Sequence, residues 1–206
     1  MRYIIRFICR LFIGERTRQP SQRYQADLII SSENTYKRQA LSESDVKELV
    51  EGFPQAKVTW VIDGDTAEVS IGWSKLRIRL DSIDCPEGGQ QWGDTATYGL
   101  IKLIGGRSVH LEVHGLDPHG RTLATIYVRH ANGVEWINVN ERMVMLGHAW
   151  VMRKFYDHLP LDRREKLNRL ENWARSRKVG LWRGQNPIPP WRWRSAESKN
   201  SNTIKR

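Results

Sequence analysis

The stretch that decides the fold is residues 57–80, which read KVTWVIDGDTAEVSIGWSKLRIRL. Residues 58–62 and 67–71 are short, mostly apolar segments joined by the Asp-Gly turn at 63–66, a pattern typical of two paired strands. Apolar residues at positions 76, 78 and 80 then alternate with charged ones, as in a strand with one buried face. The stretch therefore predicts three successive β-strands.

The pattern continues towards the C terminus with further strands and helices. Residues 107–113 and 122–129 are predicted strands on either side of a turn-rich segment. Helices are predicted at 94–103, 139–146 and 162–178, the last with Leu167, Leu170, Trp173 and Ala174 on its inner face. Five strands with these helices predict an α+β, mainly β fold: a five-stranded OB-type barrel with about three helices.

The segments outside the barrel differ in composition. Residues 1–14 form a basic amphipathic leader, and residues 15–54 are predicted to be a flexible linker with a short helix near its end. The barrel domain is assigned to residues 55–185. Residues 186–206 form a Pro/Trp/Arg-rich segment and a polar tail, and the prolines predict no regular structure over residues 186–194.

The composition of the basic leader, residues 1–14, bears on where in the cell the protein is found. Its arginines run through the apolar residues instead of preceding them, which argues against a cleavable signal peptide, and no run of about 18 apolar residues predicts an ordinary span. A cytoplasmic protein, or one peripheral to a membrane through weak anionic-lipid contact of residues 1–14, is therefore expected. The leader could instead pack on the domain or be disordered. Cys9 and Cys85 are too far apart in the sequence to indicate a disulfide framework.

The charge balance points to a polyanionic partner. The chain has 33 basic and 23 acidic residues, a net charge of +10, which favours nucleic acid or an anionic membrane. Residues 152–194 hold 12 of the basic side chains against 4 acidic ones. Aromatic residues interleave with them and are candidates for stacking on substrate bases; alternatively, they strap the C terminus to the barrel. These candidates are Phe155, Tyr156, Trp191 and Trp193.

Two acidic turns, 63–66 and 84–87, each follow a predicted strand. Carboxylates are the hard oxygen ligands that Ca²⁺ and Mg²⁺ prefer. Arg79 precedes the second turn, and Arg121 follows the turn at 117–120; guanidinium groups stabilise charge on a phosphoryl group. Taken singly, each feature also fits a hairpin turn or a surface ion pair.

Their joint order is more specific, together with motifs that run from residue 57 to residue 182. These are VIDGDT at 61–66, RLDSIDCPE at 79–87, GQ at 89–90 with Gly93, DxxGR at 117–121, VN at 139–140, GHAW at 147–150 and GLW at 180–182. In these motifs, and in the PIPPWxWR ending, the chain resembles the staphylococcal-nuclease-like (thermonuclease) family.

That resemblance implies a calcium-dependent nuclease acting on DNA and/or RNA, with endonucleolytic cuts and 3′-phosphate products. It implies Ca²⁺ as the cofactor, and by the same analogy export is an alternative to a cytoplasmic or membrane-peripheral location. The protein is expected to be a monomer. By the same resemblance, Asp65, Asp84 and the main-chain carbonyl of Cys85 would bind the metal, where the family more usually has Thr at position 85. Glu87 would hold or deprotonate the attacking water, and Arg79 and Arg121 would bind the phosphate.

Two alternatives remain at this point. The fold also serves as a catalytically inactive module that binds nucleic acid or protein, but such a module is expected to lack one of these side chains, and all are present here. The histidines at 110, 114 and 119 have no HExxH or cysteine partner, so they are interpreted as surface residues and not as a zinc site.

Overall fold

The computed structural model describes residues 43–204, and the division of the chain into two units falls between Val46 and Lys47. The predicted leader and most of the predicted linker lie outside the described residues. Helix α3 (Glu43–Glu51) matches the short helix expected near the end of the linker. Within the second unit, Val50 of α3 is buried, and Glu51 pairs with Arg129.

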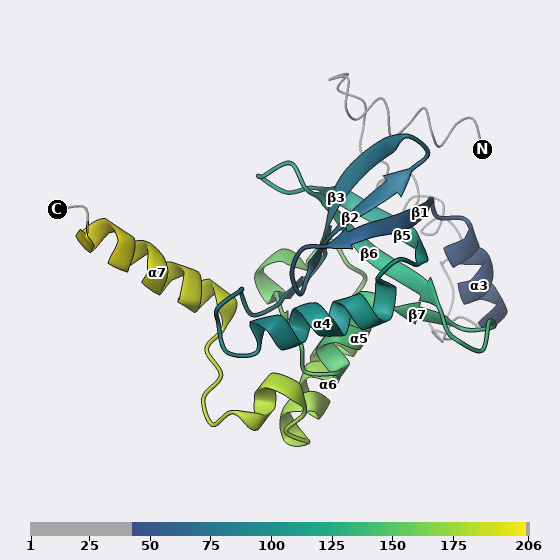
Figure 1. The fold of residues 1–206 in the computed structure, drawn as a ribbon. Helices are drawn as coiled ribbons and strands as arrows, with labels where there is room; N and C mark the ends of the chain where they lie inside the picture. Colours follow the sequence, from purple (N-terminus) through teal and green to yellow (C-terminus); the bar gives the residue numbers. More distant parts are fainter. Residues whose placement is uncertain (1–42, 205–206) are drawn as a thin grey trace. The chain divides into compact units, whose positions relative to one another are not determined.

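A closed sheet forms the centre of the second unit (Figure 1). Its strand order is β3-β2-β1-β5-β6-β7, and a parallel pairing of β3 with β6 closes the barrel. The five long strands confirm the predicted OB-type barrel. They are β1 (Gln55–Val61), β2 (Thr66–Ile71), β3 (Ser74–Leu80), β5 (Ser108–Leu116) and β6 (Thr122–Arg129).

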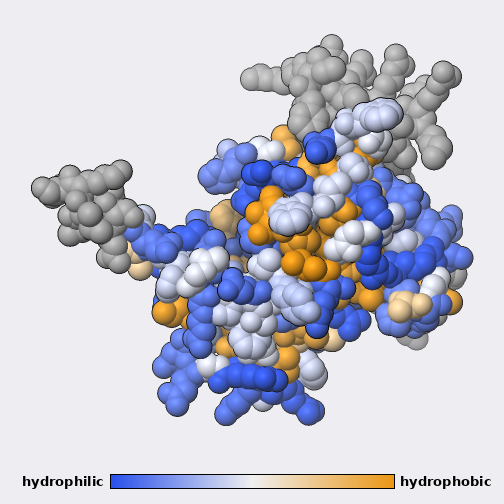
Figure 2. All heavy atoms as spheres, in the orientation of Figure 1, coloured by the Kyte–Doolittle hydropathy of each residue, from blue (hydrophilic) through white to orange (hydrophobic). Residues whose placement is uncertain are grey.

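The barrel core follows from strand alternation, because side chains two residues apart point to the same face. Val69, Ile78 and Ile126 are fully buried there. Helices α4 (Gly93–Ile104) and α5 (Val139–Met145) add Leu100 and Met143 to the same cluster. Polar residues cover most of the face in Figure 2, and apolar colour gathers over the barrel strands.

Several short elements complete the unit. Strand β4 (Ile83–Asp84) pairs with β8 (Trp150–Val151), and β7 (Trp136–Asn138) extends the main sheet. The 3₁₀ turns η1 (Arg153–Phe155) and η2 (Gly180–Arg183) lie on either side of α6 (Leu161–Ser176). No helix within the described range 43–204 has the length and apolar character needed to cross a bilayer.

The prediction of an irregular C terminus is wrong for most of the segment. Helix α7 spans Pro190–Ile204, and it joins the three helices predicted with the barrel and the short helix predicted near the end of the linker. The physical reason is the position of the proline. Pro190 is the first residue of α7, where a helix needs no backbone N–H donor and the fixed φ angle of proline suits the helix.

The predicted inner face of α6 is wrong at one residue. Leu167 and Ala174 are buried, but Trp173 is 46% exposed. Glu171 is buried instead, and it accepts a hydrogen bond from the Val151 amide of β8 at 3.0 Å. The two-residue strand β8 leaves this amide in need of an acceptor, and a carboxylate on α6 supplies it.

Candidate active site

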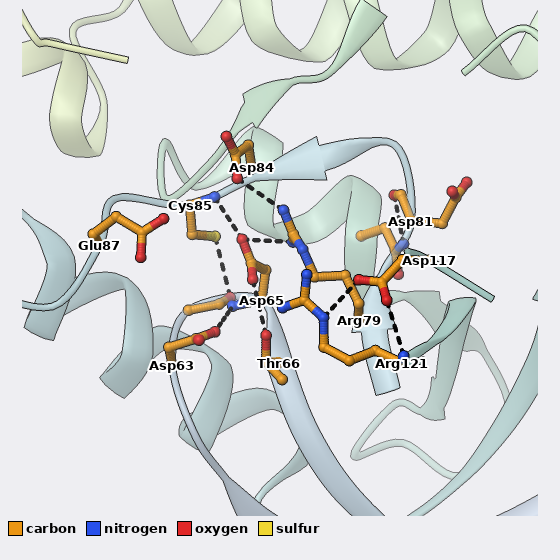
Figure 3. Close-up of polar contacts among 12 residues, drawn as sticks. Asp63, Asp65, Thr66, Arg79, Asp81, Asp84, Cys85, Glu87, Asp117 and Arg121 are labelled. Carbon is orange, nitrogen blue, oxygen red and sulfur yellow. Dashed lines mark hydrogen bonds and ion pairs between the residues drawn. The ribbon is translucent and has the colours of Figure 1, made fainter. Parts of the chain in front are cut away.

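Three carboxylates gather where β2 begins and β4 ends (Figure 3). Asp65 lies immediately before β2, Asp84 is the last residue of β4, and Glu87 follows in the next loop. Arg79 of β3 joins the two aspartates: Nη1 lies 2.6 Å from Oδ2 of Asp65, and Nη2 lies 2.8 Å from Oδ1 of Asp84. Residues from two separate acidic turns are thus brought to one guanidinium.

The first acidic turn is held by its own side chains. Oδ1 of Asp63 accepts a hydrogen bond from the Asp65 amide at 3.0 Å, and the Thr66 hydroxyl donates to Oδ1 of Asp65 at 3.2 Å. Oδ2 of Asp65 accepts from the amide of Cys85 at 2.8 Å. These contacts fix the turn and join it to the loop that follows β4.

The pKa values of Asp65 and Arg79 reflect their burial and their mutual contact. Burial raises the pKa of Asp65 to about 7, with Arg79 opposing the shift and the charges of Asp63 and Asp84 adding to it. Burial lowers the pKa of Arg79, but the two aspartates more than offset this, so its pKa stands above the usual value. The site therefore concentrates negative charge in a place where water screens it poorly.

Arg79 has one feature suited to binding a phosphate. Its Nη1 atom is buried and has no hydrogen-bond partner among the described residues, because the N–H is not aligned with the nearby Asp65 oxygen. The ion pair with Asp65 at 2.6 Å balances the charge of Nη1 but leaves it without an aligned hydrogen-bond acceptor among the described residues. An anionic oxygen of a ligand would satisfy it.

Cys85 is fixed and inert as a side chain. Its Sγ donates to the carbonyl of Gly64 at 3.1 Å, and the residue is buried. Burial and the neighbouring Asp65 raise the pKa of the thiol well above its ordinary value. Because a thiolate is needed for attack, these surroundings argue against a nucleophilic role for Cys85.

Glu87 lies in a loop held close to α4. Its amide donates to Oε1 of Gln90 at 3.0 Å, and a Cβ atom on Gly93 would lie 2.0 Å from the Glu87 carbonyl oxygen. Only glycine permits this approach, which explains the Gly93 of the sequence motif. The Glu87 side chain is 36% exposed, so it faces both the acidic cluster and solvent.

Arg121 enters the site from the adjacent strand. It directly precedes β6, whose parallel pairing with β3 sets Leu123 opposite Arg79. In the view of Figure 3 its guanidinium overlaps Asp65 and Arg79, and it contacts Asp117. Asp117 holds this side chain: Oδ2 accepts from Nε of Arg121 at 2.7 Å, and Oδ1 accepts from the Arg121 amide at 2.9 Å.

Asp117→Asn tests whether this contact positions Arg121. The asparagine oxygen keeps the hydrogen bond to the backbone amide, but the amide nitrogen cannot accept from Nε. We expect catalytic turnover of a nucleic acid substrate to fall on the order of tenfold, with an unchanged unfolding midpoint, since misplaced groups lose rate without loss of fold. Equal turnover in steady-state assays of both proteins would contradict a positioning role.

Sequence reasoning missed Arg194. It lies on α7, and its Nη2 atom is 2.8 Å from Oδ2 of Asp84, while Nη1 contacts both Asp84 and Glu87. Burial lowers its pKa, but the hydrogen bonds that Arg194 donates to Asp84 and Glu87, together with their charges, more than offset this, so its pKa stands above the usual value. Because Arg194 lies 110 residues from Asp84, no local pattern indicates this contact. The basic character of residues 152–194 is the only related signal in the sequence.

The four predicted stacking residues do not form one surface. Phe155 is 58% exposed, whereas Tyr156 packs against the barrel core. Trp191 packs edge-on against Trp150, with ring centroids 6.4 Å apart, and is 37% exposed. Trp193 has a buried Nε1 atom for which residues 43–204 offer no hydrogen-bond partner. The contact of Trp191 with Trp150 is the kind expected of a strap, and the exposed Phe155 ring has the Lys154 ammonium over it at 5.3 Å.

Comparison with known proteins agrees with this geometry. The family model described as "Staphylococcal nuclease homologue" matches residues 77–184. An "Uncharacterized endonuclease" of Escherichia coli O157:H7 is 38% identical over 138 residues, which cover 67% of this chain and 83% of that protein. A "Micrococcal nuclease" of Shigella flexneri is 34% identical over 151 residues, which cover 72% and 84%.

A plant relative shares the domain within a longer chain. The "Probable staphylococcal-like nuclease CAN2" of Oryza sativa subsp. japonica is 38% identical over 120 residues, which cover 58% of this chain but only 29% of that protein. The matched family model covers the chain from β3 to η2, which includes Arg79, Asp84, Glu87 and Arg121. The chain belongs to the staphylococcal nuclease family.

Proposed function

We propose that the protein is a calcium-dependent nuclease that hydrolyses phosphodiester bonds of DNA and/or RNA by internal cuts that leave 3′-phosphates. One observation carries the proposal: the largely buried Arg79 joins Asp65 to Asp84, and Glu87 lies in the loop that follows Asp84. The relatives named as nucleases support the activity. The metal and the products rest on family resemblance and on the chemistry of the side chains.

The side chains fit a hard divalent cation. Asp65 and Asp84 offer carboxylate oxygens, and the main chain of Cys85 adjoins Asp65 through the 2.8 Å hydrogen bond from its amide. Oxygen-only ligands of this kind suit Ca²⁺. These three residues would hold the ion, which would supply a positive charge to a non-bridging phosphate oxygen.

The other residues have roles that follow from their positions. Glu87, partly exposed and next to Asp84, would orient a water molecule and take its proton. Arg79 would offer its unsatisfied Nη1 to a phosphate oxygen. Arg121, held by Asp117, would stabilise charge that builds on phosphorus and on the leaving oxygen.

A basic pocket beside Arg121 supports a path for the substrate. It has a volume of about 330 Å³ and is formed by strands β2 and β3 and the turn before β6. We propose that the nucleic acid backbone passes over it, because two further cationic side chains line it and attract phosphates. The lining residues are Glu68, Lys75, Leu76, Arg77, His119, Gly120 and Arg121.

Calcium titration of the purified full chain tests the metal assignment. We expect heat of binding for the natural protein, and at least tenfold weaker affinity for Asp84→Asn, because that change removes one carboxylate charge from the site. Asp94→Asn is the matched control, since Asp94 is exposed on α4, and it should bind like the natural protein. Undiminished binding by Asp84→Asn would refute the assignment.

A further inference from the structure

Three metal-ligating side chains meet at a place that the proposed nuclease chemistry does not use. They are Asp81, His114 and His158, and one ligand atom from each lies within 4.8 Å of the others. Nε2 of His158 is 2.9 Å from Oδ2 of Asp81, and the two imidazole rings have centroids 5.0 Å apart. From these contacts we infer a second metal site, specific for a zinc-type divalent transition ion.

The backbone directs the His114 and His158 side chains towards Asp81. His114 is the extra residue in β5 where the pairing with β6 shifts register between Val113 and Gly115. Such a bulge turns a side chain out of the regular alternation. His158 comes from the segment between η1 and α6, in a turn closed by the Leu159 amide and the Tyr156 carbonyl.

Asp81 is held firmly in the turn between β3 and β4. Its amide donates to the Ala124 carbonyl at 2.9 Å, and its carbonyl accepts from Nδ2 of Asn140 at 3.0 Å. The Ser82 hydroxyl donates to Oδ2 of Asp81 at 2.6 Å. The carboxylate is 3% exposed at the residue level, so it is a fixed ligand with an ordered surrounding, as metal ligands require.

The histidines meet the remaining requirements. Burial holds the pKa of His114 below its ordinary value, which keeps a lone pair on the ring. Its Nε2 atom is hydrogen bonded to the Thr125 hydroxyl at 2.9 Å, a contact that fixes the ring orientation. The His158 side chain is 40% exposed, so an ion can reach the site from solvent.

The ligand chemistry selects the type of ion. Imidazoles and carboxylates commonly bind Zn²⁺ and similar transition ions. In open sites three protein ligands of this kind are completed by a water in the fourth position. Ca²⁺ prefers oxygen ligands alone. The nearby cation Arg163 is compensated, because its Nη1 atom lies 2.7 Å from the Glu112 carboxylate, and so it does not repel a divalent ion strongly.

An ion here would act on the active site through the backbone. Asp81 lies in the five-residue path from Arg79 to Asp84, and the site would tie this turn to β5 and to the segment before α6. Binding that favours the folded state raises the unfolding temperature. The inferred ion is therefore a structural one that fixes the turn between a phosphate-binding arginine and a metal-binding aspartate.

Zinc and cobalt titrations of the full chain, with Ca²⁺ at saturation, test the inference. We expect one Zn²⁺ bound per chain, a rise in the unfolding temperature, and visible d–d absorption with Co²⁺. His158→Ala and His114→Ala should each weaken binding at least tenfold. The control His130→Ala changes an imidazole in the β6–β7 turn, outside the cluster, and should bind like the natural protein.

A second comparison separates this site from the proposed nuclease site. Asp84→Asn should keep its affinity for Zn²⁺ even where it loses affinity for Ca²⁺. Absence of zinc binding, or equal binding by the natural protein and both cluster variants, would overturn the inference and leave Asp81 and His158 as an ion pair only. Neither result would bear on the calcium-dependent activity.

Discussion

Glu87→Gln is expected to lower the rate of phosphodiester cleavage by roughly 10²–10⁴-fold, the usual contribution of a positioned acid–base group. The change keeps the shape of the side chain and removes its charge and its ability to accept a proton. The Glu87 loop is fixed by its backbone, through the Gln90 side chain and the close approach to Gly93. The variant should therefore fold like the natural protein, and initial rates on a labelled oligonucleotide measure the loss.

Glu135→Gln is the matched control, because Glu135 is an exposed carboxylate in the β6–β7 turn. It should cleave at the natural rate. A Glu87→Gln protein with a natural circular dichroism spectrum and a natural cleavage rate would remove Glu87 from the mechanism. Arg121→Ala should give a loss of similar kind, since a transition-state donor contributes on the order of 10²–10³-fold.

Gly180→Ala should have the largest effect on stability. Gly180 has φ of +61°, and a Cβ atom there would lie 2.2 Å from the Gly147 carbonyl oxygen. That oxygen accepts the hydrogen bond from the Leu181 amide at 2.9 Å, so it cannot move without breaking a contact. Left-handed strain and the clash together should reduce the free energy of unfolding by about 2–5 kcal/mol, measured by urea denaturation.

Gly72→Ala separates the cost of the left-handed backbone from the cost of the steric clash. Gly72 has φ of +58°, nearly the same as Gly180, but a Cβ atom there would meet nothing within 4 Å. This control should lose only about 1–2 kcal/mol, the cost of the left-handed backbone. Equal losses for the two variants would show that the approach of Gly180 to Gly147 does not matter.

The barrel could be predicted from the sequence because its signals are local. The alternation along β3 and the Asp-Gly turn between β1 and β2 each involve only a few neighbouring residues. Strands β4 and β8 could not be predicted, since two residues have no periodicity and their pairing joins positions 66 or more residues apart. Helix α7 was missed because its prolines suggested a break, although Pro190 stands where a helix accepts one.

The residues of the two sites also fall into those that local motifs indicate and those that only the tertiary structure brings together. Asp65, Asp84 and Arg79 lie in motifs that the sequence displays, and the structure brings them into contact. Arg194 reaches Asp84 and Glu87 from over 100 residues away. The histidines were grouped by spacing at 110, 114 and 119, but the partner of His114 is His158, which a bulge and a distant turn bring near. Such contacts depend on tertiary structure alone.

Cleavage of circular single-stranded DNA tests the central claim most directly. The circle has no ends, so its conversion to linear and shorter products requires internal cuts. The purified protein is incubated with the circle in Ca²⁺, in Mg²⁺ and in chelator. The account predicts cleavage in Ca²⁺ and none in chelator or in Mg²⁺ alone. An intact circle in Ca²⁺, or equal cleavage in the presence of chelator, would contradict a calcium-dependent endonuclease.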